Sequence, residues 1–138
     1  MEQHIEAVAT IADQVGHLYK HKTPFRIYHG STNSTRQSQF RRDELIDTSH
    51  LHHVISVDLE SKFALVEPNV AMDTLVEETR KHGLIPPVVM EFPGITVGGG
   101  FSGTAGESSS FKFGFFDRTV DWIEIVLANG RGNGGLPR

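Results

Sequence analysis

The sequence predicts an α+β fold, in which a mixed sheet is flanked by helices. Apolar residues recur at three- and four-residue spacing over residues 3–21 and again over 72–82, which indicates two amphipathic helices. Short runs rich in β-forming residues lie between and after these helices. With 138 residues, 38% of them hydrophobic and 22% charged, the chain has the size and composition of one globular domain.

Composition also excludes several classes of function. The net charge of −4 disfavours nucleic acid as the main partner, because neutralising phosphates requires a basic surface. The chain has no cysteine, so disulfides, thiolate zinc sites and a cysteine nucleophile are excluded together. No apolar run approaches the length of a membrane span, and the N-terminus lacks the layout of a signal peptide. We therefore expect a soluble protein.

The first third of the chain is predicted to form a helix, a strand and a polar loop. The helix over residues 3–21 ends before Pro24, and residues 25–28 follow as a strand rich in β-formers. The loop after this strand consists of Gly30, Ser31, Thr32, Asn33, Ser34 and Thr35. Its amide and hydroxyl donors can surround phosphate oxygens, but small polar residues are also favoured in ordinary surface turns. Both interpretations stay open at this point.

The middle of the chain is predicted to contain three strands and the second helix. Residues 45–47 form a short strand, and the runs 54–59 and 63–67 form a hairpin because only a short polar break separates them. The helix over residues 72–82 is followed by Gly83, a favoured residue for ending a helix. Two prolines keep residues 84–89 extended.

Residues 93–116 are the densest glycine segment of the chain. Seven glycines lie among hydroxyl residues, and apolar residues such as Phe101 and Phe111 distinguish the segment from a flexible linker. Glycine leaves the backbone bare and able to adopt positive φ, so successive amides can form a concave anion site. The segment therefore predicts a phosphate-bearing ligand held by main-chain amides in a glycine-rich loop.

The last predicted strand covers residues 120–128, and we expect its Trp122 to lie in the core. Asn129-Gly130 is a strong signal for a two-residue hairpin turn. The glycine-rich residues 131–138 that follow do not resemble a returning strand, so we expect the hairpin to lack its partner. On this interpretation the domain covers residues 1–130, is incomplete at its C-terminus, and ends in a divergent tail. An unpaired strand makes self-association of two copies plausible.

Other chemical sites are disfavoured. His50, His52 and His53 lie close together, but no third ligand arranged with them is evident beyond Asp47, which favours a solvated or structural cluster over a zinc site. Ser102 is not in the Gly-x-Ser-x-Gly pattern of a serine nucleophile. The letters of Gly98–Gly103 match a dinucleotide fingerprint, but no clear helix follows them and no acidic residue lies at the matching strand end. We predict no metal site.

The order of these elements resembles the FAD-binding domain of the p-cresol methylhydroxylase and vanillyl-alcohol oxidase superfamily. Within it, Thr-Val-Gly-Gly-Gly-Phe-Ser-Gly-Thr-Ala-Gly-Glu-Ser-Ser-Ser at 96–110 and Glu-Ile-Val-Leu-Ala-Asn-Gly at 124–130 are most similar to the delta-24 sterol reductase branch and its fungal FAD-linked oxidase relatives. The resemblance covers nearly the whole chain. It implies a PCMH-type FAD-binding domain whose pyrophosphate lies between two loops.

The resemblance also implies the residues that contact FAD. In the later loop they are Thr96, Val97, Gly98, Gly99, Gly100, Ser102, Gly103, Thr104, Gly106, Glu107 and Ser108. In the earlier loop they are Gly30, Ser31, Thr32, Asn33, Ser34 and Thr35, where many relatives have Arg-Gly-Gly-Gly-His-Ser with a histidine sometimes bonded to the flavin. This chain departs from that pattern, so the FAD is expected to be non-covalent. For Glu107 a loop-stabilising role is equally compatible, and Lys112 and Arg118 are expected at the surface.

In a complete relative, the resemblance implies hydride transfer to the flavin from NADPH or an alcohol, with a second domain placing a sterol or other small substrate. It also implies a cytoplasmic or membrane-associated protein. We expect this chain to supply the flavin scaffold without turnover of its own. The alternatives are a truncated, non-catalytic gene product and a generic module for binding nucleotide phosphates.

Overall fold

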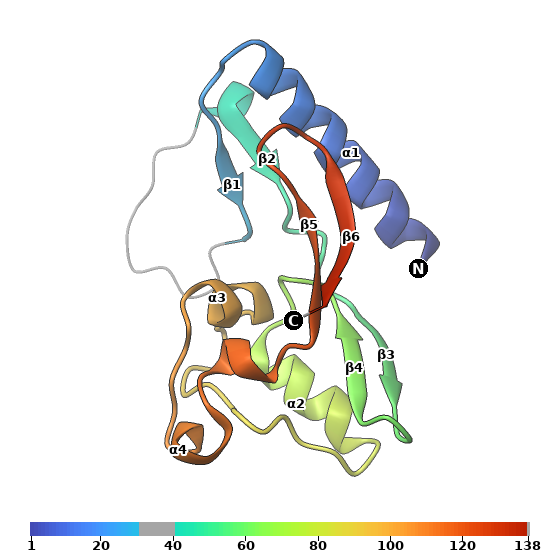
Figure 1. Cartoon of the computed structure of the whole chain (residues 1–138), viewed down its shortest axis with the longest axis vertical. Helices are drawn as coiled ribbons and strands as arrows, with labels where there is room; N and C mark the ends of the chain where they lie inside the picture. Colours follow the sequence, from blue (N-terminus) through green and yellow to red (C-terminus); the bar gives the residue numbers. More distant parts are fainter. Residues whose placement is uncertain (31–40, 138) are drawn as a thin grey trace. The chain divides into compact units, whose positions relative to one another are not determined.

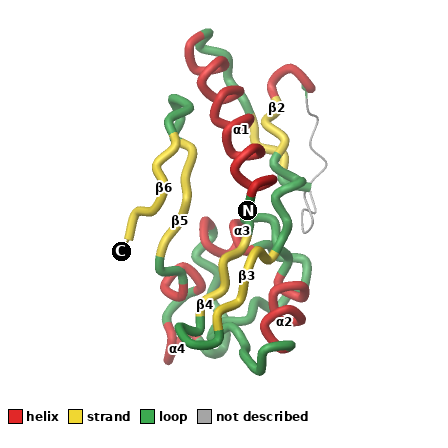
Figure 2. Tube along the Cα trace, turned by 90° about the vertical axis from the view of Figure 1, so that its right-hand side faces the viewer, coloured by secondary structure: helices red, strands yellow, loops and turns green. Residues whose placement is uncertain are grey.

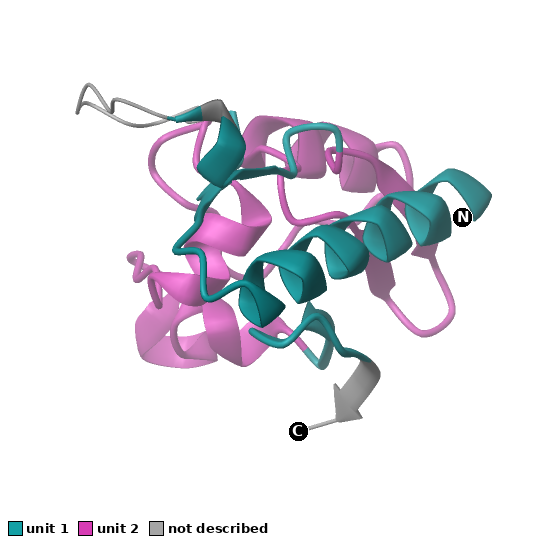
Figure 3. Cartoon of the chain, turned by 90° about the horizontal axis from the view of Figure 1, so that it is seen from above, with its two compact units in different colours: residues 1–50, 121–138 teal, residues 51–120 magenta. Residues whose placement is uncertain are grey.

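The computed structural model describes residues 1–30 and 41–137, and it confirms the α+β class (Figure 1). The elements in chain order are α1 (Glu2–Lys20), β1 (Arg26–Tyr28), the 3₁₀ helix η1 (Arg42–Glu44), β2 (Leu45–Asp47), β3 (Val54–Asp58), β4 (Phe63–Val66), α2 (Met72–Arg80), α3 (Val97–Ser102), α4 (Ser110–Phe113), the 3₁₀ helix η2 (Phe116–Thr119), β5 (Trp122–Val126) and β6 (Gly132–Pro137). No helix in the described ranges is long and apolar enough to cross a membrane. The chain divides into two compact units, residues 1–50 with 121–138 and residues 51–120 (Figure 3).

The described strands pair two by two instead of forming one continuous mixed sheet. β1 and β2 are parallel, whereas β3–β4 and β5–β6 are antiparallel hairpins. Figure 2 shows the two strands of each hairpin side by side. The strands are three to six residues long, so each pair offers a short edge. Parallel and antiparallel pairing are therefore both present among the described strands, but in separate sheets.

In the first unit, the apolar stripe of α1 packs against β2 and β5. Ile11 and Val15 of this helix are buried, and Ile46 of β2 is among the most deeply buried side chains of the chain. The parallel pairing sets Ile27 opposite Ile46. The spacing of Ile11 and Val15 is the one that the amphipathic pattern predicted. The N-terminal helix is therefore held by its apolar face.

A close contact between two glycines joins α1 to the turn of the β5–β6 hairpin. Gly130 has a φ of +78°, and a Cβ atom placed on it would lie 2.6 Å from the main-chain nitrogen of Gly16 and 2.6 Å from the carbonyl oxygen of Ala12. The Gly130 amide donates to the Leu127 carbonyl at 2.8 Å, so the turn has Ala128 and Asn129 at its centre and Gly130 follows them with positive φ, one residue away from the predicted Asn-Gly turn. No larger residue fits at Gly130 without moving the helix.

The expectation that β5 lacks a partner strand is wrong. β6 returns antiparallel to β5, and the register sets Val126 opposite Gly132 and Trp122 opposite Pro137. Strand pairing uses main-chain N–H and C=O groups, which glycine also supplies, and the turn at Asn129-Gly130 fixes the register. The ground for expecting self-association through an unpaired β5 is thereby removed.

Trp122 is not a core residue either. Its side chain is 50% exposed, whereas its neighbours Ile123 and Ile125 are half-buried. Alternation along a strand places successive side chains on opposite faces. In β5 the isoleucines occupy the more buried face, and Trp122 lies on the other.

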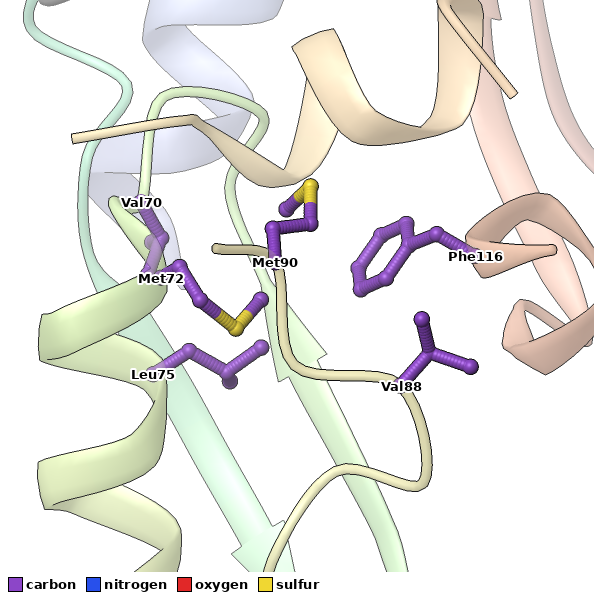
Figure 4. Packing of buried hydrophobic residues seen from close by; sticks show 6 residues of the cluster. All are labelled: Val70, Met72, Leu75, Val88, Met90 and Phe116. Carbon is purple, nitrogen blue, oxygen red and sulfur yellow. The ribbon is translucent and has the colours of Figure 1, made fainter. Parts of the chain in front are cut away.

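The second unit has its own apolar core. Val70, Met72 and Leu75, from the start of α2 and the turn before it, meet Val88 and Met90 of the extended segment and Phe116 of η2 (Figure 4). Val88 and Val70 are almost completely buried. The extended segment therefore passes through the core of this unit at Val88 and Met90, although two prolines precede them.

Candidate functional site

The glycine-rich segment contains a short helix where the sequence predicted a loop. α3 begins after Thr96, whose Oγ1 accepts a hydrogen bond from the Gly99 amide at 3.1 Å. A threonine at this position is a favourable N-cap because its oxygen satisfies an amide that has no partner within the helix. The helix ends at Gly103, whose amide donates to the Gly99 carbonyl at 2.9 Å. The expectation of a loop is therefore wrong for residues 97–102.

Several amides that were predicted to hold a phosphate donate inside the chain instead. The Val97 amide donates to the Val70 carbonyl at 2.8 Å, and the Gly98 amide donates to the Pro68 carbonyl at 2.7 Å. The Gly100 amide donates to the Thr96 carbonyl at 2.8 Å. The first two of these bonds join the glycine-rich segment to the turn before α2, and the third lies within the segment. In this structure they are not available as donors to a ligand.

Packing explains two glycines of this segment. A Cβ atom at Gly100 would overlap the Sδ atom of Met90 and lie 3.1 Å from Cδ1 of Phe116. A Cβ atom at Gly106 would lie 2.8 Å from the ring of Phe115. Both positions need glycine because a neighbouring side chain fills the space that a methyl group would take.

The remaining candidate residues are exposed on α3 and the turn after it, and we name this set the hydroxyl surface. Its members are Gly99, Ser102, Gly103, Thr104, Gly106 and Ser108, all of them exposed. Thr104 has a φ of +48°, which is uncommon for a residue with a branched side chain. Three hydroxyls beside bare backbone are a donor set that fits a phosphate-bearing group. The residues present therefore fit a nucleotide ligand through hydroxyls more than through the amides of α3.

Glu107 has a structural role in this loop. Its Oε1 accepts a hydrogen bond from the Glu91 amide at 2.9 Å, and its own amide donates to Ser110 Oγ at 2.9 Å. Ser109 Oγ donates to the Pro87 carbonyl at 2.9 Å. These bonds fasten the turn after α3 to the extended segment at residues 87–91. They hold the hydroxyl surface in place.

The earlier candidate loop is described only at its first residue. Gly30 is exposed and has a φ of +85°, which suits a tight turn after β1. Ser31, Thr32, Asn33, Ser34 and Thr35 lie outside the described residues. Gly30 belongs to the first unit and the hydroxyl surface to the second.

Two basic side chains accompany the hydroxyl surface in the second unit. Lys112 Nζ lies 5.0 Å from the centroid of the Phe113 ring, and Arg118 Nε lies 3.8 Å from an Asp117 carboxylate oxygen. Both are exposed, as expected. The carboxyl groups with a lowered pKa, those of Asp47 and Asp58, lie elsewhere, on β2 and β3.

In the histidine cluster at His50, His52 and His53, His53 bonds to a buried carboxylate. His53 Nδ1 lies 2.8 Å from Oε2 of Glu67, a buried carboxylate that also accepts from the His53 amide at 2.7 Å. The His52 and His53 rings stack with centroids 4.6 Å apart. Within the described ranges no group of three or more histidine, cysteine, aspartate or glutamate residues is arranged to hold a metal ion.

Sequence reasoning missed the residues that support this site from a distance in the chain. The carbonyls of Pro68 and Val70 receive the amides of α3, and Met90 and Phe116 pack against Gly100. No local pattern marks these residues, because each acts through a partner at least 10 positions away.

Comparison with known proteins gives consistent matches. The FAD binding domain family matches residues 4–132. The delta(24)-sterol reductase of Pisum sativum is 39% identical over 85 residues, which are 62% of this chain and 15% of that protein. The human delta(24)-sterol reductase is 33% identical over 99 residues, 72% of this chain and 19% of that protein. A probable L-gulonolactone oxidase 4 of Arabidopsis thaliana is 39% identical over 66 residues, 48% of this chain and 11% of that protein.

The matched region is a small part of the sterol reductases, since the chain spans less than a fifth of their length. The family match, in contrast, covers the chain from the first turns of α1 to the start of β6. Both the predicted resemblance and the α+β class agree with it. The chain belongs to the FAD binding domain family.

Proposed function

We propose that this chain binds FAD non-covalently and that the hydroxyl surface contacts the pyrophosphate. The single observation that carries this proposal is the exposure of Ser102, Thr104 and Ser108 on one short segment of a chain that belongs to the FAD binding domain family. Hydroxyls donate short hydrogen bonds to phosphate oxygens without adding charge. Hydroxyl donors of this kind can bind a pyrophosphate where no arginines are clustered.

The residues of the site have separate roles in this proposal. Ser102, Thr104 and Ser108 donate to the ligand, and Gly99 and Gly103 allow it to approach the backbone closely. Glu107 orients the turn through its bond to the Glu91 amide. FAD, when bound, supplies the hydride-transfer chemistry, and the protein supplies binding and orientation. The family resemblance implies that Gly30 and residues 31–35 also contact FAD, and we include them in the proposal.

The experiment is a fluorescence titration of FAD with hydroxyl-deletion variants. Ser102→Ala and Ser108→Ala each remove one donor to a charged group, so we expect the affinity for FAD to fall about tenfold for each. Ser56→Ala removes an exposed hydroxyl on β3, outside the site, and serves as the matched control. Equal affinities of all four proteins would contradict the assigned role of the hydroxyl surface.

Competition with ADP separates flavin binding from generic binding of nucleotide phosphates. A flavin site recognises groups that ADP lacks, so we expect ADP to compete much more weakly than FAD. Equal potency would favour the generic module. Separation of the flavin from the protein on acid denaturation is the expected sign of non-covalent binding, and flavin that stays with the precipitate would contradict it.

The reaction of a whole sterol reductase is a further proposal. The relatives are named delta(24)-sterol reductases, and this chain matches less than a fifth of them. We propose that the chain does not reduce a delta(24)-sterol with NADPH when tested alone, because the region it matches is less than a fifth of the proteins that carry that name. Steady-state turnover by the purified chain with FAD, NADPH and such a sterol would overturn this.

A further inference from the structure

Two histidines lie one turn apart at the exposed C-terminal end of α1. His17 and His21 are separated by four residues, both are exposed, and their ring centroids are 4.2 Å apart with an interplanar angle of 33°. Residues at this spacing are neighbours on one face of a helix. The two imidazoles are therefore close enough to share one ligand. This pair is distinct from the cluster at His50, His52 and His53 and from the hydroxyl surface.

A hydrogen bond fixes which nitrogen of His21 is available. Its Nδ1 lies 2.8 Å from the main-chain carbonyl oxygen of His17. A carbonyl only accepts, so Nδ1 carries a proton, and in the neutral ring Nε2 then keeps its lone pair. Histidines that bind metals in proteins usually donate their other N–H to a carbonyl or a carboxylate in this way, which orients the ring. His21 is therefore already in the tautomer that a metal ion requires.

We propose that His17 and His21 form a two-histidine site for a divalent transition-metal ion, with Cu(II) the tightest binder. Neutral imidazole suits copper, nickel and zinc, and affinity for a given set of nitrogen ligands rises towards Cu(II). The site lies at the negative end of the α1 dipole, which favours a cation. Lys20 and Lys22 lie next to it in the sequence and weaken the attraction. Water completes the coordination, because no three-residue metal cluster is found in the described part of the chain.

The test is a titration of the full chain with Cu(II), followed by electron paramagnetic resonance for coupling of the metal to ring nitrogen. Loss of a residue that hydrogen-bonds a metal-binding histidine lowers metal affinity about 10- to 100-fold. Loss of the metal-binding histidine itself should lower the affinity at least as much. We expect His17→Gln and His21→Gln each to lower the affinity at least about tenfold. His82→Gln removes an exposed histidine near the end of α2 and is the matched control, with unchanged affinity expected.

A relocated pair distinguishes chelation from a general loss of histidines. Asp13 is exposed one turn before His17, so Asp13→His in the His21→Gln background restores a pair at the same spacing. We expect this double variant to regain most of the lost affinity. Circular dichroism confirms that α1 is intact in each variant. Unchanged Cu(II) affinity in His17→Gln/His21→Gln, or no recovery in the relocated pair with α1 intact, would overturn the proposal.

Discussion

At the scale of single residues, Gly100 is held by neighbours that leave no room for a methyl group. Met90 and Phe116 cover it from the core of the second unit. In an exposed helix, replacing glycine by alanine stabilises the helix by about 1 kcal/mol. At Gly100 the crowding outweighs that gain, because interiors are close-packed and an added carbon displaces its neighbours.

Gly100→Ala is therefore expected to lower the free energy of unfolding by about 1–3 kcal/mol, measured by urea denaturation. Met90→Val removes the atoms that the new methyl group would meet. In the Met90→Val background, Gly100→Ala should lower the free energy of unfolding by less than it does in the original chain, because the two changes are coupled. Strictly additive effects of the two substitutions would show that the contact with Met90 is not the cause.

A second prediction at this scale concerns Asp47, whose pKa is held below its ordinary value. The Ser49 hydroxyl donates to its Oδ1 at 2.6 Å and is the larger cause, and the Ser49 amide donates at 2.9 Å. A carboxyl with a lower pKa in the folded state stabilises the fold above its unfolded pKa of about 4. That stabilisation is lost as the pH falls through the folded pKa.

Ser49→Ala should then lower the free energy of unfolding at pH 7 and have a smaller effect at about pH 3, where the carboxyl of the unfolded chain is largely protonated and the stabilisation is being lost. Urea denaturation at the two pH values measures the difference. The same loss at both pH values would mean that the serine acts through packing and not through the Asp47 carboxylate.

At the scale of elements, the contact between α1 and the β5–β6 turn depends on Gly130. Gly130→Ala adds a Cβ atom to a residue with positive φ and presses it against the backbone of Gly16 and Ala12. We therefore expect the free energy of unfolding to fall by about 2–4 kcal/mol. Gly83→Ala is the matched control, because Gly83 has a φ of +71° and nothing within 4 Å of the added Cβ. Its loss should be about 1–2 kcal/mol, the cost of the backbone conformation alone. Equal losses would contradict the packing of the helix on the turn.

Most elements could be predicted from the sequence because their signals are local. The stripe of α1, the turn at Asn129-Gly130 and the hairpin at residues 54–66 each depend on residues a few positions apart. β6 was missed because a run of glycines carries no side-chain pattern, although its backbone pairs as any strand does. α3 was missed for the same reason, since glycines disfavour a helix unless tertiary contacts hold it.

At the scale of the whole molecule, the family and the cofactor class could be predicted, but the use of the glycine-rich segment could not. Its motif was specific enough to indicate FAD. Whether each amide is free or bonded depends on Pro68 and Val70, which are distant in the sequence. Under the proposal made above, the exposed hydroxyls of Ser102, Thr104 and Ser108 contact the ligand instead of the bonded amides of α3.

If FAD binds the folded chain and not the unfolded chain, FAD should raise the free energy of unfolding. A ligand at 100 times its dissociation constant raises the free energy of unfolding by about 2.7 kcal/mol, if the unfolded chain does not bind it. Urea denaturation with and without FAD should show this increase, and the increase should be smaller for Ser102→Ala at the same FAD concentration. An unfolding midpoint that does not move at saturating FAD would contradict binding to the native state.

Retention of flavin through gel filtration tests the central claim most directly. The purified chain is mixed with excess FAD, separated from free flavin, and the absorbance of the protein peak is measured at the flavin bands. The account predicts about one flavin per chain, released when the protein is unfolded. A protein peak without flavin, from a chain that circular dichroism shows to be folded, would contradict it.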